Sequence, residues 1–365
     1  ERLMFSWISL SNFRSYQDLR WNPDPGVNIL VGDNGAGKTN LLEALTYLAT
    51  LRSFRSAPDE ALVTETQPSA VVRGEVLRGE SSALIEVEIN RKGRRRVRLD
   101  QKSLNRRAEL LGVVRVVTFL PEDLDLIKGS PGGRREMIDE VAVQLWPAAD
   151  LDQSEYERAL RQRNSFLRAG SRDEATLQVW DSRLALAAGR VMARRARAVQ
   201  ELATSLSATY AQVAGHPSQV SIQYESEWGG TADPTTPPAE WATALLEALV
   251  RRRRPDWELG VTGAGPHRDD LRFTIDGHPS RFQASQGEQR TLALSVRLAT
   301  HSAVNRLTAS NPVLILDDVF SELDPQRASH LTAALPSSQT MISTTHPEEI
   351  PVPGKTWHVE AGMIR

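Results

Sequence analysis

The segment Gly32–Thr39 limits what this chain can fold into more than any other part of the sequence. It reads Gly-Asp-Asn-Gly-Ala-Gly-Lys-Thr and fits the phosphate-loop pattern G-x-x-x-x-G-K-[ST]. The apolar run Val27–Val31 before it predicts a strand, and Leu41–Ala49 after it predicts a helix, which is the setting that such a loop requires. A glycine-rich turn that merely begins a helix is the alternative, but this context favours a loop whose backbone N–H groups surround a phosphate.

A strand that ends in two carboxylates supplies the second part of a nucleotide site. The run Val313–Asp318 is apolar until its last two residues, Asp317 and Asp318. At the carboxyl edge of a parallel sheet, Asp317 and the Thr39 hydroxyl would hold Mg²⁺, while Asp318 would act on the attacking water as general base or orienter. Lys38 would reach the β- and γ-phosphates of ATP. Many strands end in an aspartate, so this motif indicates a nucleotide site only in combination with the phosphate loop.

Three further motifs lie in the C-terminal part of the chain. Ser285, Gln286, Gly287, Glu288 and Gln289 open an amphipathic helix predicted over Arg290–Val304, Ser321 to Asp324 follow the acidic strand, and His346 follows a strand predicted over Thr340–Thr345. Each has an ordinary explanation, because Ser285 and Glu288 would form a capping box and a single histidine is most often structural. In this order, together with the two motifs above, they resemble the signature motif, the D-loop and the switch histidine of the ABC-type ATPases.

In that class two heads enclose two ATP molecules. The resemblance therefore implies that Ser285 binds the γ-phosphate held by the other subunit, with Gly287 allowing close backbone approach. It also implies that Ser321 and Asp324 belong to the D-loop and that His346 senses the γ-phosphate.

Two departures from the ABC pattern affect the expected chemistry. The residue after the Walker-B aspartate is usually glutamate, whereas here it is Asp318, which is one methylene shorter. The shorter reach predicts slow hydrolysis, with ATP acting more as a clamp than as a fuel. No clear Q-loop glutamine is found in the region Val116–Asp123, where Pro121, Glu122 and Asp123 stand instead.

The spacing of the motifs indicates which kind of ABC-type ATPase the chain resembles. About 250 positions separate Lys38 from Ser285, far more than in a transporter ATPase subunit, and helical patterns lie between them. SMC-like DNA-repair ATPases have such an interrupted head, but their insert is a coiled coil of several hundred residues with a hinge or a zinc hook. Here the insert has about 130 residues, and the chain has no cysteine. The chain thus resembles the RecF family, through Leu10–Tyr16, Leu51–Arg55, Pro121–Leu124, Gly129–Pro131 with Arg134 and Arg135, Gly265–Asp270 and Leu316–Asp324.

The expected fold class is α/β: an ABC-type P-loop ATPase head, with a mixed sheet and helices, and an inserted helical lobe that resembles a truncated SMC coiled coil. The head is expected over residues 1–125 and 256–365 and the lobe over residues 126–255. Alternating or apolar runs predict strands at Met4–Leu10, Ala70–Leu77 and Ala83–Ile89, with a hairpin turn at Asn90–Gly93. Helical patterns cover Arg134–Leu145, Leu151–Leu167, Glu174–Val213, Glu240–Arg252 and Pro325–Leu335.

The RecF resemblance also implies a function and a set of nucleotide contacts. It implies a weak, DNA-stimulated ATPase that forms an ATP-dependent homodimer. It also implies that the dimer binds double-stranded and single-stranded or gapped DNA and helps to load recombinase with RecO and RecR partners. The setting would be DNA repair, recombination, replication and the SOS response, in the cytoplasm with the nucleoid and without a membrane partner. The implied nucleotide contacts are Gly32, Asp33, Asn34, Gly35, Ala36, Gly37, Lys38, Thr39, Asn40 and Arg14.

The charge pattern allows DNA binding without making the whole chain basic. The net charge is −2, but Lys and Arg together number 44 and all but five are arginine, whose fork matches phosphate oxygens. The candidate contacts to DNA phosphates are Arg94, Arg95, Arg96 and Arg98 first and Arg251, Arg252, Arg253 and Arg254 second. A solvated face is the ordinary explanation of either cluster.

Composition and motifs also define the alternatives. The lack of cysteine excludes a disulfide scaffold, cysteine-based zinc sites and thiol catalysis, no apolar run approaches the ~18 residues of a membrane span, and we expect no signal peptide. A head of another SMC-like complex that processes DNA ends stays open, and so, less favoured, does a transporter ATPase subunit. A plain P-loop kinase or GTPase is disfavoured, since it would have no use for a signature motif.

Overall fold

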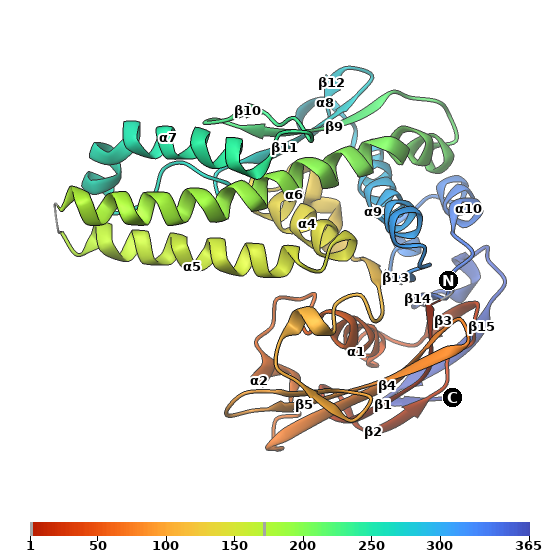
Figure 1. Cartoon of the computed structure of the whole chain (residues 1–365). Coiled ribbons are helices and arrows are strands. Elements are labelled where there is room, and N and C mark those ends of the chain that lie inside the picture. Colours follow the sequence, from red (N-terminus) through yellow and green to blue (C-terminus); the bar gives the residue numbers. More distant parts are fainter. Residues whose placement is uncertain (1–2, 171–172) are drawn as a thin grey trace. The chain divides into compact units, whose positions relative to one another are not determined.

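The computed structural model describes residues 3–170 and 173–365 (Figure 1). They form two compact units. The head unit consists of Glu1–Leu124, Ala211–His216 and Leu294–Arg365, and the lobe unit consists of Asp125–Tyr210 and Pro217–Ala293. The first boundary lies next to the expected one, but residues 256–293, which we expected in the head, belong to the lobe unit.

One sheet of the head unit is antiparallel. Its order is β2 (Tyr16–Trp21), β1 (Leu3–Phe13), β4 (Ser69–Arg78), β5 (Ser81–Asn90), β6 (Arg96–Leu99) and β7 (Lys102–Leu104). Alternate residues of β4 and β5 are buried, as expected for a sheet with one face on the core. The strands predicted at Met4–Leu10, Ala70–Leu77 and Ala83–Ile89 are confirmed, and the predicted turn at Asn90–Gly93 lies in the β5–β6 hairpin.

The other sheet of the head unit is mostly parallel. Its order is β16 (Met363–Ile364), β15 (Lys355–Glu360), β3 (Val27–Val31), β14 (Thr340–Thr344), β13 (Val313–Asp317) and β8 (Val116–Phe119), and only β16 runs antiparallel to its neighbour. Every residue of β13 and β14 is buried, which explains why β13 reads as an unbroken apolar run before its aspartate. The carboxyl ends of β3, β13 and β14 meet at one edge.

The helix after the phosphate loop, α1 (Lys38–Thr50), contacts strands of both head sheets. Its residues Leu41–Ala49 are all buried, and all but Glu43 and Thr46 are apolar or aromatic. The other helices of the head unit are α2 (Asp59–Leu62), α10 (Pro325–Ala334) and most of α9 (Gln286–Thr308), with short 3₁₀ turns at Arg107–Glu109, Pro121–Leu124, Phe320–Glu322 and Pro347–Glu349.

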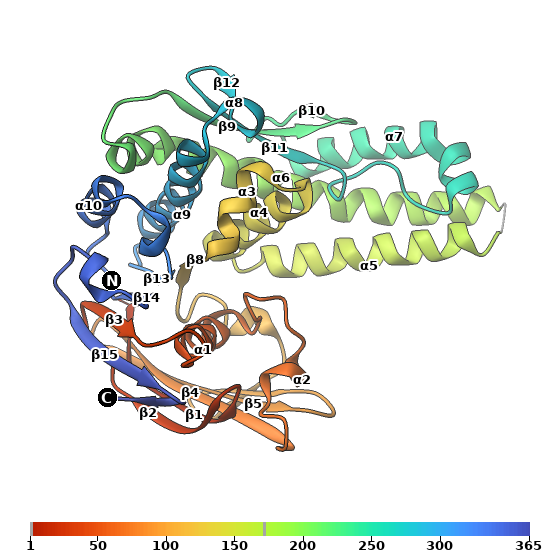
Figure 2. The same cartoon turned by 180° about the vertical axis from the view of Figure 1, so that it is seen from behind.

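The lobe unit contains all the predicted helices of the insert. They are α4 (Pro131–Leu145), α5 (Ala149–Arg168), α6 (Glu174–Ala214) and α7 (Pro238–Leu259), accompanied by the short α3 (Asp125–Lys128) and α8 (Ser280–Gln283). The helices α5, α6 and α7 lie side by side in both views (Figure 1, Figure 2) and share a core of alanine and leucine side chains. The end of α6 belongs to the head unit. None of the described helices is both long and apolar enough to cross a bilayer.

The lobe unit also contains a sheet that the helical patterns do not predict. Its order is β10 (Gly230–Thr231), β9 (Val220–Ser226), β11 (Asp270–Ile275) and β12 (His278–Pro279). The two central strands are short, and more than forty residues of other structure separate them in the chain. Their pairing depends on long-range contacts that a local pattern does not reveal. The insert is therefore a helical lobe with a small sheet.

Candidate nucleotide site

The phosphate loop follows β3 directly and is bent by two glycines in the left-handed region. The φ angle is 85° at Gly35 and 115° at Gly37, values that residues with a Cβ rarely adopt. A Cβ on Gly37 would also lie 3.0 Å from the Tyr16 hydroxyl and 3.1 Å from Ser15 Oγ. Tyr16 donates a hydrogen bond of 3.0 Å to the Gly37 carbonyl oxygen, so the β1–β2 hairpin holds the end of the loop.

Lys38 begins α1, and its side chain turns back across the loop. Its Nζ donates to the carbonyl oxygens of Gly32 (2.6 Å) and Asp33 (3.0 Å). Burial lowers the pKa of Lys38, while the carboxylates of Asp318, Asp317 and Asp33 oppose that shift. A phosphate oxygen would compete well for this ammonium, because hydrogen bonds between charged groups are stronger than those to a neutral carbonyl.

Asp317 is the last residue of β13, and its buried carboxylate accepts two hydroxyl hydrogen bonds. Thr39 Oγ1 donates to Asp317 Oδ1 over 3.1 Å, and Ser343 Oγ donates to the same oxygen over 2.5 Å. Burial raises the pKa of Asp317, and these two bonds act in the opposite direction. The described residues contain no cluster of three potential His, Cys, Asp or Glu ligands. The carboxylate of Asp317 and the hydroxyl of Thr39 supply oxygen ligands, and these fit Mg²⁺, which takes few protein ligands and completes its shell with water and phosphate.

Asp318 adopts an unusual backbone conformation beside Asp317. Its φ is 50°, in the left-handed region that residues other than glycine seldom occupy. Its N–H lies 2.9 Å from Ser343 Oγ and 3.2 Å from the Ser343 carbonyl oxygen. Asp318 Oδ1 is buried and accepts no hydrogen bond from the described residues.

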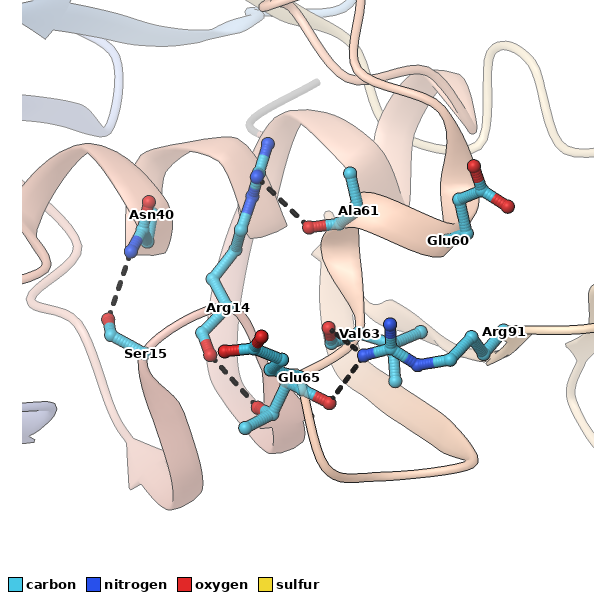
Figure 3. Close-up of a pocket in the computed structure, with 9 residues that line it drawn as sticks. Arg14, Ser15, Asn40, Glu60, Ala61, Val63, Glu65 and Arg91 are labelled. Atoms are coloured by element: carbon cyan, nitrogen blue, oxygen red, sulfur yellow. Dashed lines mark hydrogen bonds between the residues drawn. The ribbon is translucent and has the colours of Figure 1, made fainter.

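A pocket of about 430 Å³ opens beside the first turn of α1 (Figure 3). Its wall is formed by Arg14, Ser15, Asn40, Glu60, Ala61, Val63, Thr64, Glu65 and Arg91. The pocket adjoins the phosphate loop, because Asn40 follows it in the chain and Ser15 packs on its last glycine. Asn40 Nδ2 donates to Ser15 Oγ over 2.9 Å, which joins the two sides of this wall.

Arg14, a predicted nucleotide contact, is held by other residues of the head unit. Its Nε and Nη2 each lie 2.9 Å from a carboxylate oxygen of Glu43, and its Nη1 donates to the Ala61 carbonyl over 3.0 Å. Glu43 is fully buried and also accepts from Ser53 Oγ. The sequence patterns gave no sign of this pair. Contact of Arg14 or Asn40 with a nucleotide stays a prediction.

The signature segment begins α9 with the capping box that its sequence allows. The Ser285 N–H donates to Glu288 Oε2 over 2.7 Å, and the Glu288 N–H donates to Ser285 Oγ over 3.3 Å. Ser285 and Gln286 are exposed. In this capping box the Ser285 hydroxyl oxygen accepts a hydrogen bond. The hydroxyl can still donate its proton to a phosphate oxygen.

Gln289 differs from the rest of the signature segment. Its side chain is buried, and Nε2 donates to the carbonyl oxygen of Ser280 over 3.0 Å, with that of Arg281 at 3.5 Å. Gln289 thus joins the first turn of α9 to α8. This arrangement gives Gln289 a local structural partner, and a direct phosphate contact by its amide stays a prediction.

The predicted D-loop and switch histidine follow β13 and β14. Ser321 Oγ donates to the Asp318 carbonyl over 2.8 Å, and Asp324 caps α10 by accepting from the Arg327 N–H over 2.9 Å. The exposed imidazole of His346 has its Nδ1 3.3 Å from a Glu348 carboxylate oxygen. Their roles toward ATP stay predictions.

The segment where a Q-loop glutamine was sought contains an ion pair instead. Arg297 of α9 binds Asp123 through Nη2 (2.5 Å) and Nε (3.2 Å), and the Leu120 N–H donates to the same carboxylate over 2.8 Å. Asp123 therefore fixes this turn against α9, which gives it a structural function.

The first arginine cluster consists of Arg94, Arg95, Arg96 and Arg98, and two of these residues form ion pairs. Arg95 pairs with Asp59 at 3.2 Å and Arg96 pairs with Glu88 at 3.4 Å. Arg94, in the β5–β6 hairpin, and Arg98, on β6, are exposed and form no ion pair within the described residues. Two of the four candidate cations are thus available for phosphate groups.

The second cluster is a series of ion pairs on α7. Arg251 pairs with Glu247, Arg252 with Asp256, Arg253 with Asp181 and Arg254 with Glu258, at 3.7, 3.7, 3.1 and 3.1 Å. Asp181 and Asp256 are buried and also bind Arg163. Arg253 therefore joins α7 to the buried Asp181 of α6, and DNA contacts of the cluster stay a prediction.

The fold and this site define the class of protein as an ABC-type P-loop ATPase head with a lobe inserted. The family model for the RecF/RecN/SMC N terminal domain matches residues 4–352. Two relatives, both called DNA replication and repair protein RecF, come from Frankia alni (40% identity over 98% of each chain) and Acidothermus cellulolyticus (40% over 99% of each). The chain belongs to the RecF family.

The solved structures agree with this assignment. The structure of the recombination mediator protein RecF-ATPrS in the RecFOR pathway has a TM-score of 0.92 and 29% identity, covering 100% of this chain and 98% of that chain. The Smc head domain from Pyrococcus furiosus bound to the C-terminal domain of ScpA gives a TM-score of 0.55 at 14% identity, over 100% and 95% of the two chains. The latter likeness supports the fold alone.

Proposed function

We propose that this chain is an ATP-dependent DNA-binding protein of recombinational repair that acts as an ATP-sandwich dimer. The observation that carries the proposal is the convergence of Lys38, Thr39, Asp317 and Asp318 at one sheet edge, in a chain that also exposes Ser285 at a helix start. The relatives named for DNA replication and repair, and the RecF of the RecFOR pathway, support the DNA role and RecO and RecR as partners.

In this proposal one copy binds ATP through the phosphate loop. Lys38 and the loop N–H groups stabilise the phosphate charge, and Thr39 and Asp317 hold Mg²⁺, which would neutralise charge on the phosphates. The Asp318 carboxylate orients the attacking water. Because the Asp318 side chain is one methylene shorter than the usual glutamate, hydrolysis is slow and ATP serves mainly to hold two copies together.

The pocket beside α1 is the proposed position of the base and ribose. It adjoins the phosphate loop through Asn40 and Ser15, and the Glu60 and Glu65 side chains at its wall offer acceptors for an exocyclic amine (Figure 3). Arg14, fixed by Glu43, would shape this wall.

The proposed dimer opens and closes by mass action. ATP held by one copy also contacts Ser285 of the other, so only the dimer gains the full binding energy of the nucleotide. Closed dimers would bind the backbone of duplex or gapped DNA without reading sequence. Hydrolysis, faster with DNA bound, would separate the copies after recombinase is loaded.

Arg94 and Arg98 are the proposed contacts to DNA phosphates. The double variant Arg94→Ala/Arg98→Ala should bind gapped duplex more weakly in ATP·Mg²⁺. Its slope of log K against log salt should fall by about four, since the dimer loses two arginines from each copy and each lost phosphate contact removes about one. Fluorescence anisotropy over a salt series measures this slope.

The matched control is Arg251→Ala/Arg254→Ala, which removes two exposed arginines that have glutamate partners on α7. This control should retain the wild-type slope. The assignment of Arg94 and Arg98 to DNA contacts is contradicted if the control shows the reduced slope while Arg94→Ala/Arg98→Ala retains the wild-type slope. Absence of ATP-dependent DNA binding in the wild type would instead favour a different P-loop ATPase function.

A further inference from the structure

Ser343 is a fully buried polar residue between the two acids of the nucleotide site. It lies on β14, directly opposite Asp317 of β13 in the parallel register. No motif in the sequence singles it out, because its partners come from a strand more than twenty residues earlier in the chain.

The Ser343 hydroxyl makes two hydrogen bonds in opposite senses. Its Oγ donates to Asp317 Oδ1 over 2.5 Å and accepts from the Asp318 N–H over 2.9 Å. The hydroxyl proton and a lone pair are thus used by adjacent acidic residues. Ser343 also presents its carbonyl oxygen to the Asp318 N–H at 3.2 Å.

The bond to the Asp318 N–H affects the direction of a catalytic carboxylate. Asp318 has a φ of 50°, in the left-handed region that is strained for a residue with a Cβ. The Asp318 Oδ1 accepts no hydrogen bond from the described residues. The carboxylate is therefore aimed largely by its backbone, which Ser343 holds.

The bond to Asp317 affects the proposed magnesium ligand in a similar way. Thr39 Oγ1 and Ser343 Oγ both donate to Oδ1 of Asp317, which fixes the rotation of the carboxylate. If Thr39 joins the metal shell, Ser343 keeps its bond, because its hydroxyl approaches from the neighbouring strand. Groups that orient metal ligands in this way typically change metal affinity or activity by about 10–100-fold when removed.

We infer that Ser343 is a positioning residue that sets Asp317 for the cation and Asp318 for the water through a single hydroxyl. This inference rests on the proposed ATPase function. A merely structural role is the competing explanation, and it would affect the stability of the fold and leave the balance between nucleotide binding, magnesium dependence and turnover unchanged.

The test compares Ser343→Ala with Ser338→Ala. Ser338 is also buried and its hydroxyl lies 3.2 Å from His301 Nε2, so the control removes a buried hydroxyl near the other end of β14. For Ser343→Ala we expect turnover to fall by about 10–100-fold and the magnesium concentration for half-maximal turnover to rise several-fold. Affinity for a fluorescent ATP analogue in EDTA should stay within about threefold of wild type, whereas the gain in affinity on adding magnesium should shrink.

Ser338→Ala should leave the magnesium dependence unchanged, even if its melting temperature falls. The inference is overturned if Ser343→Ala has wild-type turnover and magnesium dependence, or if both variants change these quantities equally. Ser343→Cys, which keeps the size and a weak donor, should recover part of the turnover. Failure of the wild type to bind or hydrolyse ATP would contradict the proposed function itself, which separates the two ideas.

Discussion

Lys38→Arg is expected to retain some ATP binding and to hydrolyse ATP at least a hundredfold more slowly than wild type. Lys38 is 7% exposed, its ammonium donates to two loop carbonyls, and three nearby carboxylates favour its charged form. A guanidinium keeps the charge but is planar and larger, so it cannot take the same position. Loss of one well-placed donor to transition-state charge typically costs about 10²–10³-fold in turnover. Filter binding of labelled ATP and a phosphate-release assay measure the two quantities.

The matched control is Lys355→Arg. Lys355 is exposed on β15 with its ammonium 4.1 Å from the centre of the Trp357 ring, a contact that arginine also makes. This variant should have wild-type turnover. Wild-type turnover in Lys38→Arg would contradict the assigned role of the phosphate-loop lysine.

Much of the head could be predicted because its signals are local. Gly32–Thr39 lies between an apolar strand and an apolar helix, and β13 reads as a buried strand with two terminal acids. The motif spacing also distinguished an interrupted head from a transporter subunit. These features depend on residues that are adjacent in the chain, so the pattern of apolar residues is sufficient to predict the strands and the helix.

The partners of the charged residues could not be predicted in the same way. Arg14 pairs with Glu43, Arg253 pairs with Asp181, and Arg297 pairs with Asp123, across 29, 72 and 174 positions. A cluster of arginines therefore looked like a free basic surface on α7, where the fold uses it for ion pairs. The hydrogen bonds of Ser343 could not be predicted for the same reason, because they depend on the register of two parallel strands.

The small sheet of the lobe unit shows a related limit. Strand β9 alternates buried and less buried residues, but it has only seven residues and follows a helix of 41. Its main partner, β11, begins at Asp270, in a stretch that we expected in the head. We based the expected division into an interrupted head and a helical lobe on composition. The pairing of β9 with β11, which lie far apart in the chain, instead places a sheet in the lobe unit.

Ser285→Arg is expected to abolish ATP-dependent dimerisation while leaving ATP binding by the monomer intact. Ser285 is exposed at the start of α9, where the proposal has it meet the γ-phosphate held by the other copy. A bulky side chain there would block close approach of the phosphate and remove the hydroxyl donor. The phosphate loop of the same copy is untouched, so binding of a fluorescent ATP analogue should be unchanged.

Ser81→Arg is the matched control, because Ser81 is exposed at the β4–β5 turn of the head unit and has no assigned role toward ATP. It should dimerise like wild type. Equal loss in both variants would show that an added surface arginine, and not the signature position, prevents association.

The most direct test of the central claim is the molar mass in solution of wild type and Ser285→Arg, measured by light scattering with and without ATP·Mg²⁺. We expect the wild-type mass to double on adding ATP·Mg²⁺ and the mass of Ser285→Arg to stay unchanged. A wild type that stays monomeric at ATP concentrations well above its affinity, or a Ser285→Arg variant that doubles as readily, would contradict this expectation.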